Sequence, residues 1–378
     1  MRLTTAAAKP IRVTHLIPQI GIGGTELQLC RLIQNSSPRR AVHRVLYYSD
    51  SLDSEGARVF DRAAIVRERV DRRGGPAMFV PRLTRAIAAG RPDILHCWLV
   101  SAALWGRLAG RAACVPDIIL SFRSAVIDEA PMLRVARLLD GRRVRYLGNT
   151  NAVADALVRS VGVPRARITV IPNGLDVKSY SVPGDRDALL RAHGCPSDAR
   201  IVLSVGRLTV AKNYEMLFRI AARGDGAAAT AHYFIAGHGE LEQDLKTTAD
   251  RLSVSHRVHF LGLRSDIPDL MASADVFCCT SRFEGFPNAL LEAMASGRPI
   301  VTTRFTGVEE IVEDGATGLI VPQDDDGAAF AAVQRLLAEP GTATALGAAA
   351  REKAATSFSN ERMVDAFLDY YERVRSRG

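Results

Sequence analysis

Short apolar runs alternate with longer Ala- and Leu-rich stretches along the whole chain, and the alternation begins again near the middle. Apolar runs of about four to eight residues, separated by segments of helical spacing, are typical of a parallel β-sheet covered by helices. The strand candidates of the first half are residues 11–18, 43–49, 93–98, 117–123, 146–149 and 168–172. Those of the second half are residues 201–205, 233–236, 258–261, 276–279, 299–303 and 319–321. The sequence therefore predicts an α/β protein with two doubly wound parallel sheets.

The length of 378 residues fits two domains of roughly 150–200 residues, each with its own core. Residues 180–198, between the two sets of strands, are rich in Pro and Gly, which suits a linker with one short helix. We expect one domain over residues 1–182 and a second over residues 183–357. Apolar residues recur at intervals of three and four in residues 358–378, so a helix is expected to close the chain and pack back toward the first domain.

The first ten residues lack the apolar core of about 7–15 residues that a secretory signal needs, and no apolar run approaches the roughly 20 residues that span a bilayer. We expect a cytoplasmic protein, free or peripheral on the cytoplasmic face of the membrane. The six cysteines show no CxxC spacing, which argues against a zinc site or a disulfide framework. They are interpreted as reduced core residues.

Positive charge is concentrated in the first half of the chain. Residues 1–180 carry 28 Lys and Arg against 14 Asp and Glu, a net charge of +14, whereas the remainder carries 21 against 27, or −6. A basic half is expected to meet an anionic partner such as lipid headgroups or a lipid-linked phosphate. The alternative is codon bias, because only five of the 49 basic residues are Lys. Both interpretations stay open.

The segment EGFPNALLEAMASGRPIVTT, which begins at Glu284, contains the most informative chemistry. It lies between two predicted strands, so Glu284 belongs to a loop at the carboxyl end of a parallel strand, where α/β sheets bind ligands. A helix is expected from about Pro287 to Ser296, and its positive N-terminal end suits a phosphate. On a helical wheel Glu292 lies away from the buried side chains Leu290, Leu291 and Met294, free to reach ligand hydroxyls.

Two cations follow the first strand of the second half. Arg207 and Lys212 leave that strand together, and Asn213 is available to cap the next helix. Cations are disfavoured at a helix N-terminus unless an anion is bound there. The pair therefore suits a diphosphate whose negative charge grows as a sugar departs.

The segment EGFPNALLEAMASGRPIV resembles the Glu-x7-Glu signature of retaining glycosyltransferases of family four, which have the GT-B fold of two Rossmann-like domains facing a cleft. Further segments occur in the family's order: GGTE, IPNGLD, VGRLTVAKN, AGHGE and FLG. The resemblance covers most of the chain. It implies that the second domain binds the nucleotide sugar and the basic first domain binds the acceptor.

The resemblance also implies roles for single residues. Glu292 is expected to bind the ribose hydroxyls, Glu284 to contact the transferred sugar, and Arg207 and Lys212 to bind the diphosphate. The other donor-binding residues that it implies are Gly23, Gly24, Gly237, Gly239, Leu263, Arg264, Gly285, Phe286, Pro287, Asn288, Ala289 and Leu290.

A dinucleotide site is an alternative interpretation of the segment IGIGGTE. This segment lacks the third glycine of the GxGxxG fingerprint, which argues against that site. We expect Thr25 or Glu26 to open a helix. The family resemblance implies that Gly24 lies near the donor phosphates; the alternative is a plain turn.

Two further residues are candidates for the catalytic group. His96 and Arg123 are each expected to end a strand of the first domain. Many relatives in the family carry His where this chain has Arg123, and an arginine cannot accept a proton as a neutral imidazole can. Arg123 is therefore expected to hold a sugar hydroxyl or an anionic group of the acceptor. His96 is either catalytic or a buried structural histidine.

No metal site and no cofactor are expected. The acidic run at residues 324–326 resembles a metal-binding Asp-x-Asp motif, but it precedes a helix, where acidic residues stabilise the N-terminus. The predicted function is metal-independent, retaining transfer of a sugar from a nucleotide diphosphate to a saccharide acceptor. A lipid-linked acceptor in lipopolysaccharide or polysaccharide synthesis is preferred to a soluble one. An epimerase or phosphorylase and a non-catalytic nucleotide-sugar sensor are the alternatives, and no nucleic-acid-binding motif is present.

Overall fold

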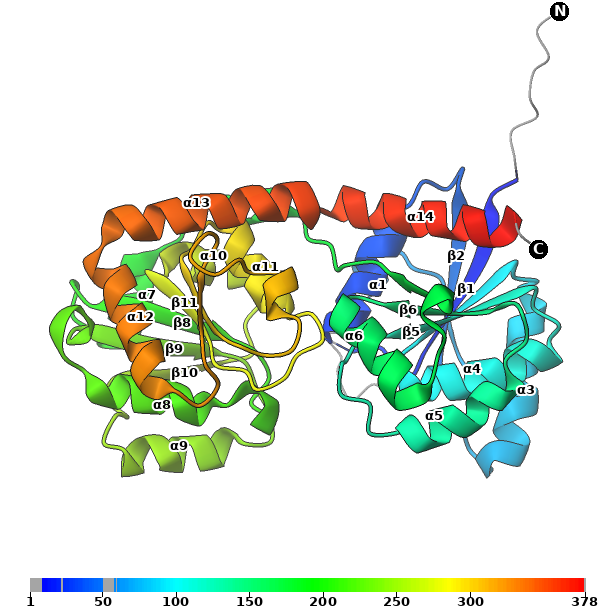
Figure 1. Ribbon diagram of the computed structural model, residues 1–378, viewed down its shortest axis with the longest axis horizontal. Coiled ribbons are helices and arrows are strands. Elements are labelled where there is room, and N and C mark those ends of the chain that lie inside the picture. Colours follow the sequence, from blue (N-terminus) through cyan, green and yellow to red (C-terminus); the bar gives the residue numbers. More distant parts are fainter. Residues whose placement is uncertain (1–8, 22, 50–57, 59, 377–378) are drawn as a thin grey trace, which may run out of the picture. The chain divides into compact units, whose positions relative to one another are not determined.

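The computed structural model describes residues 9–21, 23–49, 58 and 60–376 (Figure 1). The chain forms two compact units. The first consists of residues 1–174 and 360–378, and the second of residues 175–359. Each unit is built on one parallel sheet, as the alternation of apolar runs predicts.

The sheet of the first unit has seven parallel strands in the order β3-β2-β1-β4-β5-β6-β7. Their bounds are β1 Ile11–Ile17, β2 Ala41–Tyr47, β3 Arg67–Arg69, β4 Ile94–Trp98, β5 Asp117–Phe122, β6 Val144–Gly148 and β7 Ile168–Val170. The helices are α1 Gly24–Asn35, α3 Gly75–Ala89, α4 Val100–Ala112, α5 Ala130–Ala136, α6 Asn151–Ala156 and α14 Asn360–Ser376. Helices α3 to α6 cover one face of the sheet, and α1 and α14 cover the other. The sequence did not predict β3, because this short edge strand reads Arg-Glu-Arg and carries no apolar signal.

The last helix completes the core of the first unit. Phe367, Leu368 and Tyr371 of α14 are almost fully buried, in one cluster with Trp98 of β4. At the surface, Arg40 lies within ion-pair distance of three carboxylates on α14, namely Asp365, Asp369 and Glu372. Although α14 comes after the whole second unit in the chain, it is part of the first.

The sheet of the second unit has six parallel strands in the order β10-β9-β8-β11-β12-β13. Their bounds are β8 Arg200–Val205, β9 Ala231–Ala236, β10 Val258–Gly262, β11 Val276–Cys279, β12 Ile300–Thr303 and β13 Leu319–Val321. The helices are α7 Arg186–Ala192, α8 Tyr214–Arg223, α9 Glu242–Arg251, α10 Ile267–Ser273, α11 Asn288–Ala295, α12 Asp326–Ala338 and α13 Pro340–Ser357. Helices α7, α10 and α11 pack on one face, and α8, α9 and α12 on the other. Both faces are buried, which explains the near-continuous apolar strands.

The boundary between the units lies at Gly174, before the predicted boundary at Val182. Leu175 and Tyr180 are buried in the core of the second unit, and the amide of Leu175 donates a hydrogen bond to the carbonyl of Phe358 (2.9 Å). Residues 175–181 therefore belong to the second unit. The breaker-rich composition after Tyr180 marks a loop inside that unit.

Strand order fixes where each unit can bind a ligand. In the second sheet the chain leaves β8 toward β9 on one side, while β11 pairs with β8 on the other. In open α/β sheets, ligands bind outside the carboxyl ends of the strands at such a point of reversal. The loops after β8 and β11 carry Arg207, Lys212 and Glu284.

The six cysteines are free, and four of them are buried as expected. Cys114 is exposed and Cys195 is half-buried, so the prediction that all six are core residues is wrong for these two. Within the described residues, no helix combines the length and the apolar character that crossing a membrane would need.

Candidate active site

The loops after β8 and β11 meet at the carboxyl edge of the second sheet and join Lys212 to Glu284. Lys212 Nζ lies 2.5 Å from Glu284 Oε1, and the hydroxyl of Ser281 donates to the same oxygen at 2.8 Å. The backbones are also tied, because Thr280 Oγ1 donates to the carbonyl of Lys212 (2.9 Å) and the amide of Arg282 donates to that of Ala211 (2.8 Å). Two sequence segments that lie far apart thus form one rigid cation–carboxylate pair.

Lys212 is charged at neutral pH although it is largely buried. Burial lowers the pKa of its ammonium group, but the nearby Glu284 carboxylate more than offsets this effect, so the pKa is raised overall. Only about a fifth of each side chain is exposed, 19% for Lys212 and 15% for Glu284. A fixed, poorly hydrated positive charge at this position interacts more strongly with a phosphate than a solvated lysine would.

Arg207 lies in the same loop as Lys212. Unlike Lys212, it is not paired with a described carboxylate and is available to bind an anion. It is exposed, and its guanidinium has no hydrogen bond or ion pair with any residue that the structure describes. Asn213 directly precedes α8, but its side chain does not make the capping hydrogen bond that was predicted. It adopts a left-handed conformation (φ 50°), and its Nδ2 donates to Asp324 Oδ1 at 3.0 Å.

The glycines of AGHGE let the loop after β9 lie directly against the loop after β8. A Cβ on Gly237 would lie 1.9 Å from the carbonyl oxygen of Gly206, and one on Gly239 would lie 2.4 Å from that of Leu208. Neither backbone position has room for a side chain. The structure therefore gives Gly237 and Gly239 a packing role, and their predicted contact with the donor stays a prediction.

Replacing Gly237 by Ala is expected to destabilise the second unit by about 1–3 kcal/mol and to displace the Arg207 loop, because one methyl group must push two backbones apart. Thermal unfolding and donor binding measure the two effects. Gly341→Ala is the matched control, since a Cβ there meets nothing within 4 Å. Equal stability of the two variants would contradict the close approach.

Helix α11 begins at Asn288, with Pro287 before it as the N-cap residue, close to the predicted start. All residues from Leu290 to Ala295 are buried, and Glu292 is only 9% exposed. The expectation that Glu292 is free of the buried face is wrong, because α11 is covered by α13 as well as by the sheet. The Glu292 carboxylate has little contact with bulk water. Hydroxyl groups of a ligand would therefore be favourable hydrogen-bond donors to it.

The remaining candidates of this segment divide by burial. The side chains of Phe286, Pro287 and Leu290 are buried, and Phe286 packs edge-on against Phe358 at 5.5 Å between ring centroids. Gly285, Asn288 and Ala289 are half-buried at the start of the helix. Side chains of the first group serve the core, so any contact that they make with a ligand is through the backbone.

Leu263 and Arg264 follow β10 at the edge of the sheet. Leu263 is exposed, and Arg264 forms an ion pair with Asp266 at 2.5 Å. Arg264 also lines a pocket of about 600 Å³ between α7 and α10. Lys212, Glu284 and Glu292 do not line that pocket.

The acidic run is fully engaged by the protein. Asp324 accepts from Asn213 and Arg282, Asp325 accepts from the amide of Ala328 at 2.8 Å, and Asp326 pairs with Arg223 at 2.9 Å. The expected helix-terminal role is confirmed for Asp325, which caps α12.

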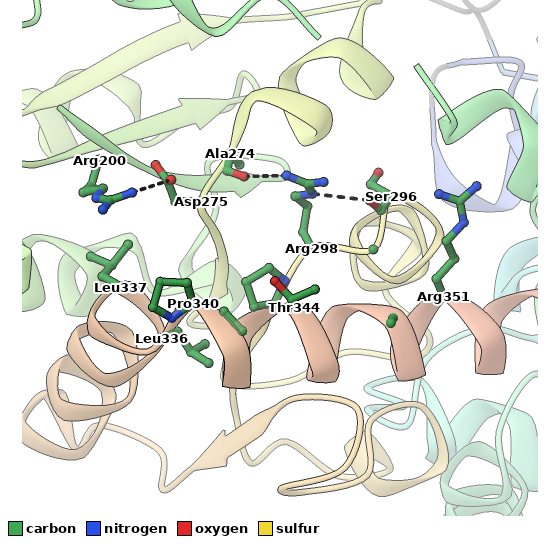
Figure 2. Close-up of a pocket in the computed structure, with 14 residues that line it drawn as sticks. Arg200, Ala274, Asp275, Ser296, Arg298, Leu336, Leu337, Pro340, Thr344 and Arg351 are labelled. Carbon is green, nitrogen blue, oxygen red and sulfur yellow. Dashed lines mark hydrogen bonds and ion pairs between the residues drawn. The ribbon is translucent and has the colours of Figure 1, made fainter. Parts of the chain in front are cut away.

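A second pocket, of about 360 Å³, lies at the amino edge of the same sheet (Figure 2). Figure 2 shows Arg298 directed toward the carbonyl groups of Ala274 and Ser296, while Arg200 meets Asp275. These cations already have partners. The pocket also lies at the opposite ends of the strands from Lys212 and Glu284, so it is not the site that the sequence predicts.

In the first unit, the loop after β1 leads directly into α1. The helix begins at Gly24, just before the predicted start at Thr25 or Glu26, and the carboxylate of the buried Glu26 lies over Gly23. A Cβ on Gly23 would lie 2.1 Å from Glu26 Oε2. The glycine therefore makes room for this carboxylate, which is favoured at the positive end of the helix.

His96 is fully buried in the first unit. Strand β4 continues to Trp98, so His96 lies in the middle of the strand and not at its end. Its Nδ1 lies 2.7 Å from the Tyr371 hydroxyl and its Nε2 lies 2.6 Å from the Ser121 hydroxyl. Burial holds the pKa of the ring well below its usual range. Both ring nitrogens thus have partners inside the first unit, and a catalytic role for His96 stays a prediction.

Arg123 follows β5 as expected and is an unusual cation. Its Nη1 donates to Asn173 Oδ1 at 3.0 Å, and the guanidinium lies 4.6 Å from the centre of the Trp98 ring. Its Nε and Nη2 are buried and have no partner among the described residues. Burial lowers the pKa of Arg123 to about 10, so the group is still charged at neutral pH. A buried charge with two unused donors fits an anion or a hydroxyl-rich ligand.

Comparison with known proteins agrees with this arrangement. The family model "Glycosyltransferase Family 4" matches residues 22–179, and "Glycosyl transferases group 1" matches residues 185–353. The D-inositol 3-phosphate glycosyltransferase of Mycolicibacterium smegmatis is 34% identical over 79% of this chain and 72% of its own. The chain belongs to glycosyltransferase family 4.

Other members of the glycosyltransferases are similar over most of the chain. The lipopolysaccharide core biosynthesis glycosyltransferase LpsE of Rhizobium meliloti is 30% identical over 67% of this chain and 75% of its own. The crystal structure of Anabaena HepE with UDP and glucose has a TM-score of 0.85 at 22% identity, covering 96% of this chain and all of HepE. The lipopolysaccharide outer core galactosyltransferase WaaB has a TM-score of 0.70 at 18% identity, covering 95% and 100%. The predicted family and the GT-B fold are confirmed.

Sequence reasoning missed several residues that support the site of this glycosyltransferase. Ser281 orients Glu284, Thr280 ties the two loops together, and Asp324 holds both Asn213 and Arg282. The hydroxyl of Tyr214 donates to the carbonyl of Gly206 (2.9 Å) and so fixes the strand end before Arg207. Their position directly beside the motif residues was the available signal.

Proposed function

We propose that this glycosyltransferase transfers a sugar from a nucleoside diphosphate to a saccharide acceptor with retention of the anomeric configuration and without a metal ion. The observation that carries the proposal is the Lys212–Glu284 pair at the reversal point between β8 and β11, with the exposed Arg207 in the same loop after β8. Two cations and the N-terminus of α11 supply positive charge where a diphosphate would leave. Glu284 supplies an acceptor for sugar hydroxyls beside them.

The reaction breaks the bond between the anomeric carbon and the phosphate oxygen, and the electron pair leaves with the diphosphate. The acceptor hydroxyl then forms the new bond from the same side, and its proton passes to the departing phosphate. In this scheme Lys212 and Arg207 stabilise the charge that develops on the diphosphate, and Glu284 orients the transferred sugar. Glu292 holds the ribose.

The first unit is proposed to bind the acceptor. Arg123 offers its two unused donors to an anionic or hydroxyl-bearing group, and the surplus of basic residues in this half favours an acceptor that carries phosphate. The relative named for lipopolysaccharide core synthesis supports a lipid-linked saccharide acceptor, and the relative named for D-inositol 3-phosphate supports an acceptor that carries phosphate.

Common UDP- and GDP-sugars, offered with lipid-linked and soluble saccharides, test the function. One donor is expected to give nucleoside diphosphate together with a new glycoside, and an α-linked donor should give an α-linked product by NMR coupling. A β-linked product would reject retention. Conversion of the nucleotide sugar into its epimer without any acceptor would make the protein an epimerase.

Replacing Glu292 by Gln is expected to weaken nucleotide binding about 10- to 100-fold, because each charge-assisted bond to a ribose hydroxyl contributes about 1.5–3 kcal/mol. Calorimetry with UDP and GDP measures the change, and Gln preserves the shape of the buried side chain. Glu309→Gln is the control, since Glu309 is exposed and pairs with Arg304 in the same unit. Unchanged affinity in the Glu292 variant would remove this assignment.

A further inference from the structure

Three side chains from separate segments of the second unit converge at the amino ends of strands β9 and β10. Cys195 follows α7 in the turn that leads to β8, His232 is the second residue of β9, and His259 is the second residue of β10. Strands β9 and β10 are paired in parallel, which places the two rings side by side. The Lys212–Glu284 pair lies at the other ends of the strands, so this cluster is separate from the candidate active site.

The potential ligand atoms of these residues form a small triangle. Cys195 Sγ lies 3.4 Å from His232 Nδ1 and 3.4 Å from His259 Nε2, and the two nitrogens are 2.9 Å apart. All three residues are half-buried. Each offers one ligand atom to the triangle, and cysteine sulfur and imidazole nitrogen are ligands that zinc prefers.

The spacing matches the edges of a metal tetrahedron. With Zn–N bonds of about 2.0–2.1 Å and a Zn–S bond of about 2.3 Å, tetrahedral geometry sets S···N at about 3.5 Å and N···N at about 3.3 Å. The two S···N distances already agree. The N···N distance must open by a few tenths of an ångström, which small ring rotations provide.

The surroundings hold the rings in place. His259 stacks on Phe234 at 4.7 Å between centroids, and His232 and His259 are nearly parallel, with 17° between their planes. Burial lowers the pKa of His232 and lowers that of His259 to about 4.

We propose that Cys195, His232 and His259 bind one Zn²⁺ ion, with water in the fourth position, and that the ion ties the turn after α7 to strands β9 and β10. This role is structural and independent of sugar transfer. Sequence motifs could not reveal the site. His232 and His259 follow Cys195 by 37 and 64 positions, and the three residues share no CxxC or HxxxH spacing. The expectation of no zinc site rested on that spacing alone.

Cobalt substitution of tag-free, metal-stripped protein tests the proposal. One equivalent of Co²⁺ is expected to give the near-ultraviolet charge-transfer band of a thiolate ligand and the intense visible bands of tetrahedral cobalt, and Zn²⁺ should abolish both. Cys195→Ser should lose the charge-transfer band. Cys114→Ser, which removes an exposed thiol from the other unit, should keep it. Absence of the band in the wild type, or its persistence in Cys195→Ser, would overturn the proposal and leave a hydrogen-bonded cluster.

Thermal unfolding supplies the second readout. Zinc at about a hundred times its dissociation constant should raise the midpoint of the wild type and of Cys114→Ser by about 5–10 °C. The midpoint of His232→Ala/His259→Ala and of Cys195→Ser should not respond. Sugar transfer by folded Cys195→Ser should match the wild type well below the midpoint. An equal zinc response in every variant would place the ion elsewhere and contradict the site.

Discussion

Replacing Lys212 by Met is expected to lower turnover by about 10²–10³-fold, because a fixed charge aimed at a leaving group commonly contributes about 2.7–4 kcal/mol to the transition state. Arg207→Met should have an effect of the same order. This second variant is the cleaner test, since Arg207 is exposed and has no partner among the described residues, so its removal leaves no buried carboxylate behind. Initial rates under saturating donor measure both. Lys246→Met is the control, because this lysine forms a surface ion pair with Glu242 in the same unit.

The same rates should persist in excess EDTA and should not rise with added Mg²⁺ or Mn²⁺. The assay belongs at a temperature well below the unfolding midpoint, where loss of a structural ion cannot unfold the protein. If turnover instead required a divalent ion while both Met variants stayed near wild type, the electrostatic role of the two cations would be wrong.

Replacing Arg123 by Met is expected to make the protein more stable and less active. Two buried nitrogens without partners cost about 1–3 kcal/mol, and an apolar side chain of similar length removes that cost. The same change removes the donors offered to the acceptor, so KM for the acceptor should rise about 10- to 100-fold while slow hydrolysis of the donor stays unchanged.

Arg107 provides a control for which the expected change in stability has the opposite sign. Unlike the half-buried Arg123, it is fully buried, and it pairs with Asp140 (2.8 Å) and donates to the hydroxyl of Tyr146 (2.9 Å). Arg107→Met strands a buried carboxylate and should destabilise the protein by about 3–5 kcal/mol. Thermal unfolding of the two variants side by side checks the sign. A loss of stability in Arg123→Met would show that this arginine holds the fold and not a ligand.

The sequence predicted the sheets well because buried parallel strands are nearly all apolar. Strand β5, for example, is buried throughout and was placed within one residue. Strand β3 was not predicted, because its three polar residues lie at the edge of the sheet. Pairing with β2, and not burial, defines this strand. The domain boundary was predicted too late in the chain for a related reason. Leu175 is a single apolar residue, and only the tertiary structure shows that it packs in the core of the second unit.

The candidate site was predictable where residues are neighbours in a motif and less so where they act through space. The pairing of Lys212 with Glu284 follows from two strand ends meeting at one edge. The burial of Glu292 did not follow from a helical wheel, which cannot show that α13 also packs against α11. Likewise, the spacing of Cys195, His232 and His259 along the chain says nothing of their convergence on one point.

The place of α14 in the first unit has a consequence for synthesis on the ribosome. The first unit is translated first, yet the cluster around Trp98 lacks Phe367 and Tyr371 until the last turns of the chain have been made. During elongation the emerging amino-terminal half therefore exposes an apolar groove, while residues 175–359 hold everything that they need to fold. The first unit is thus expected to finish folding only after residues 360–376 have been made, and a nascent chain stalled before Asn360 should be a strong chaperone client.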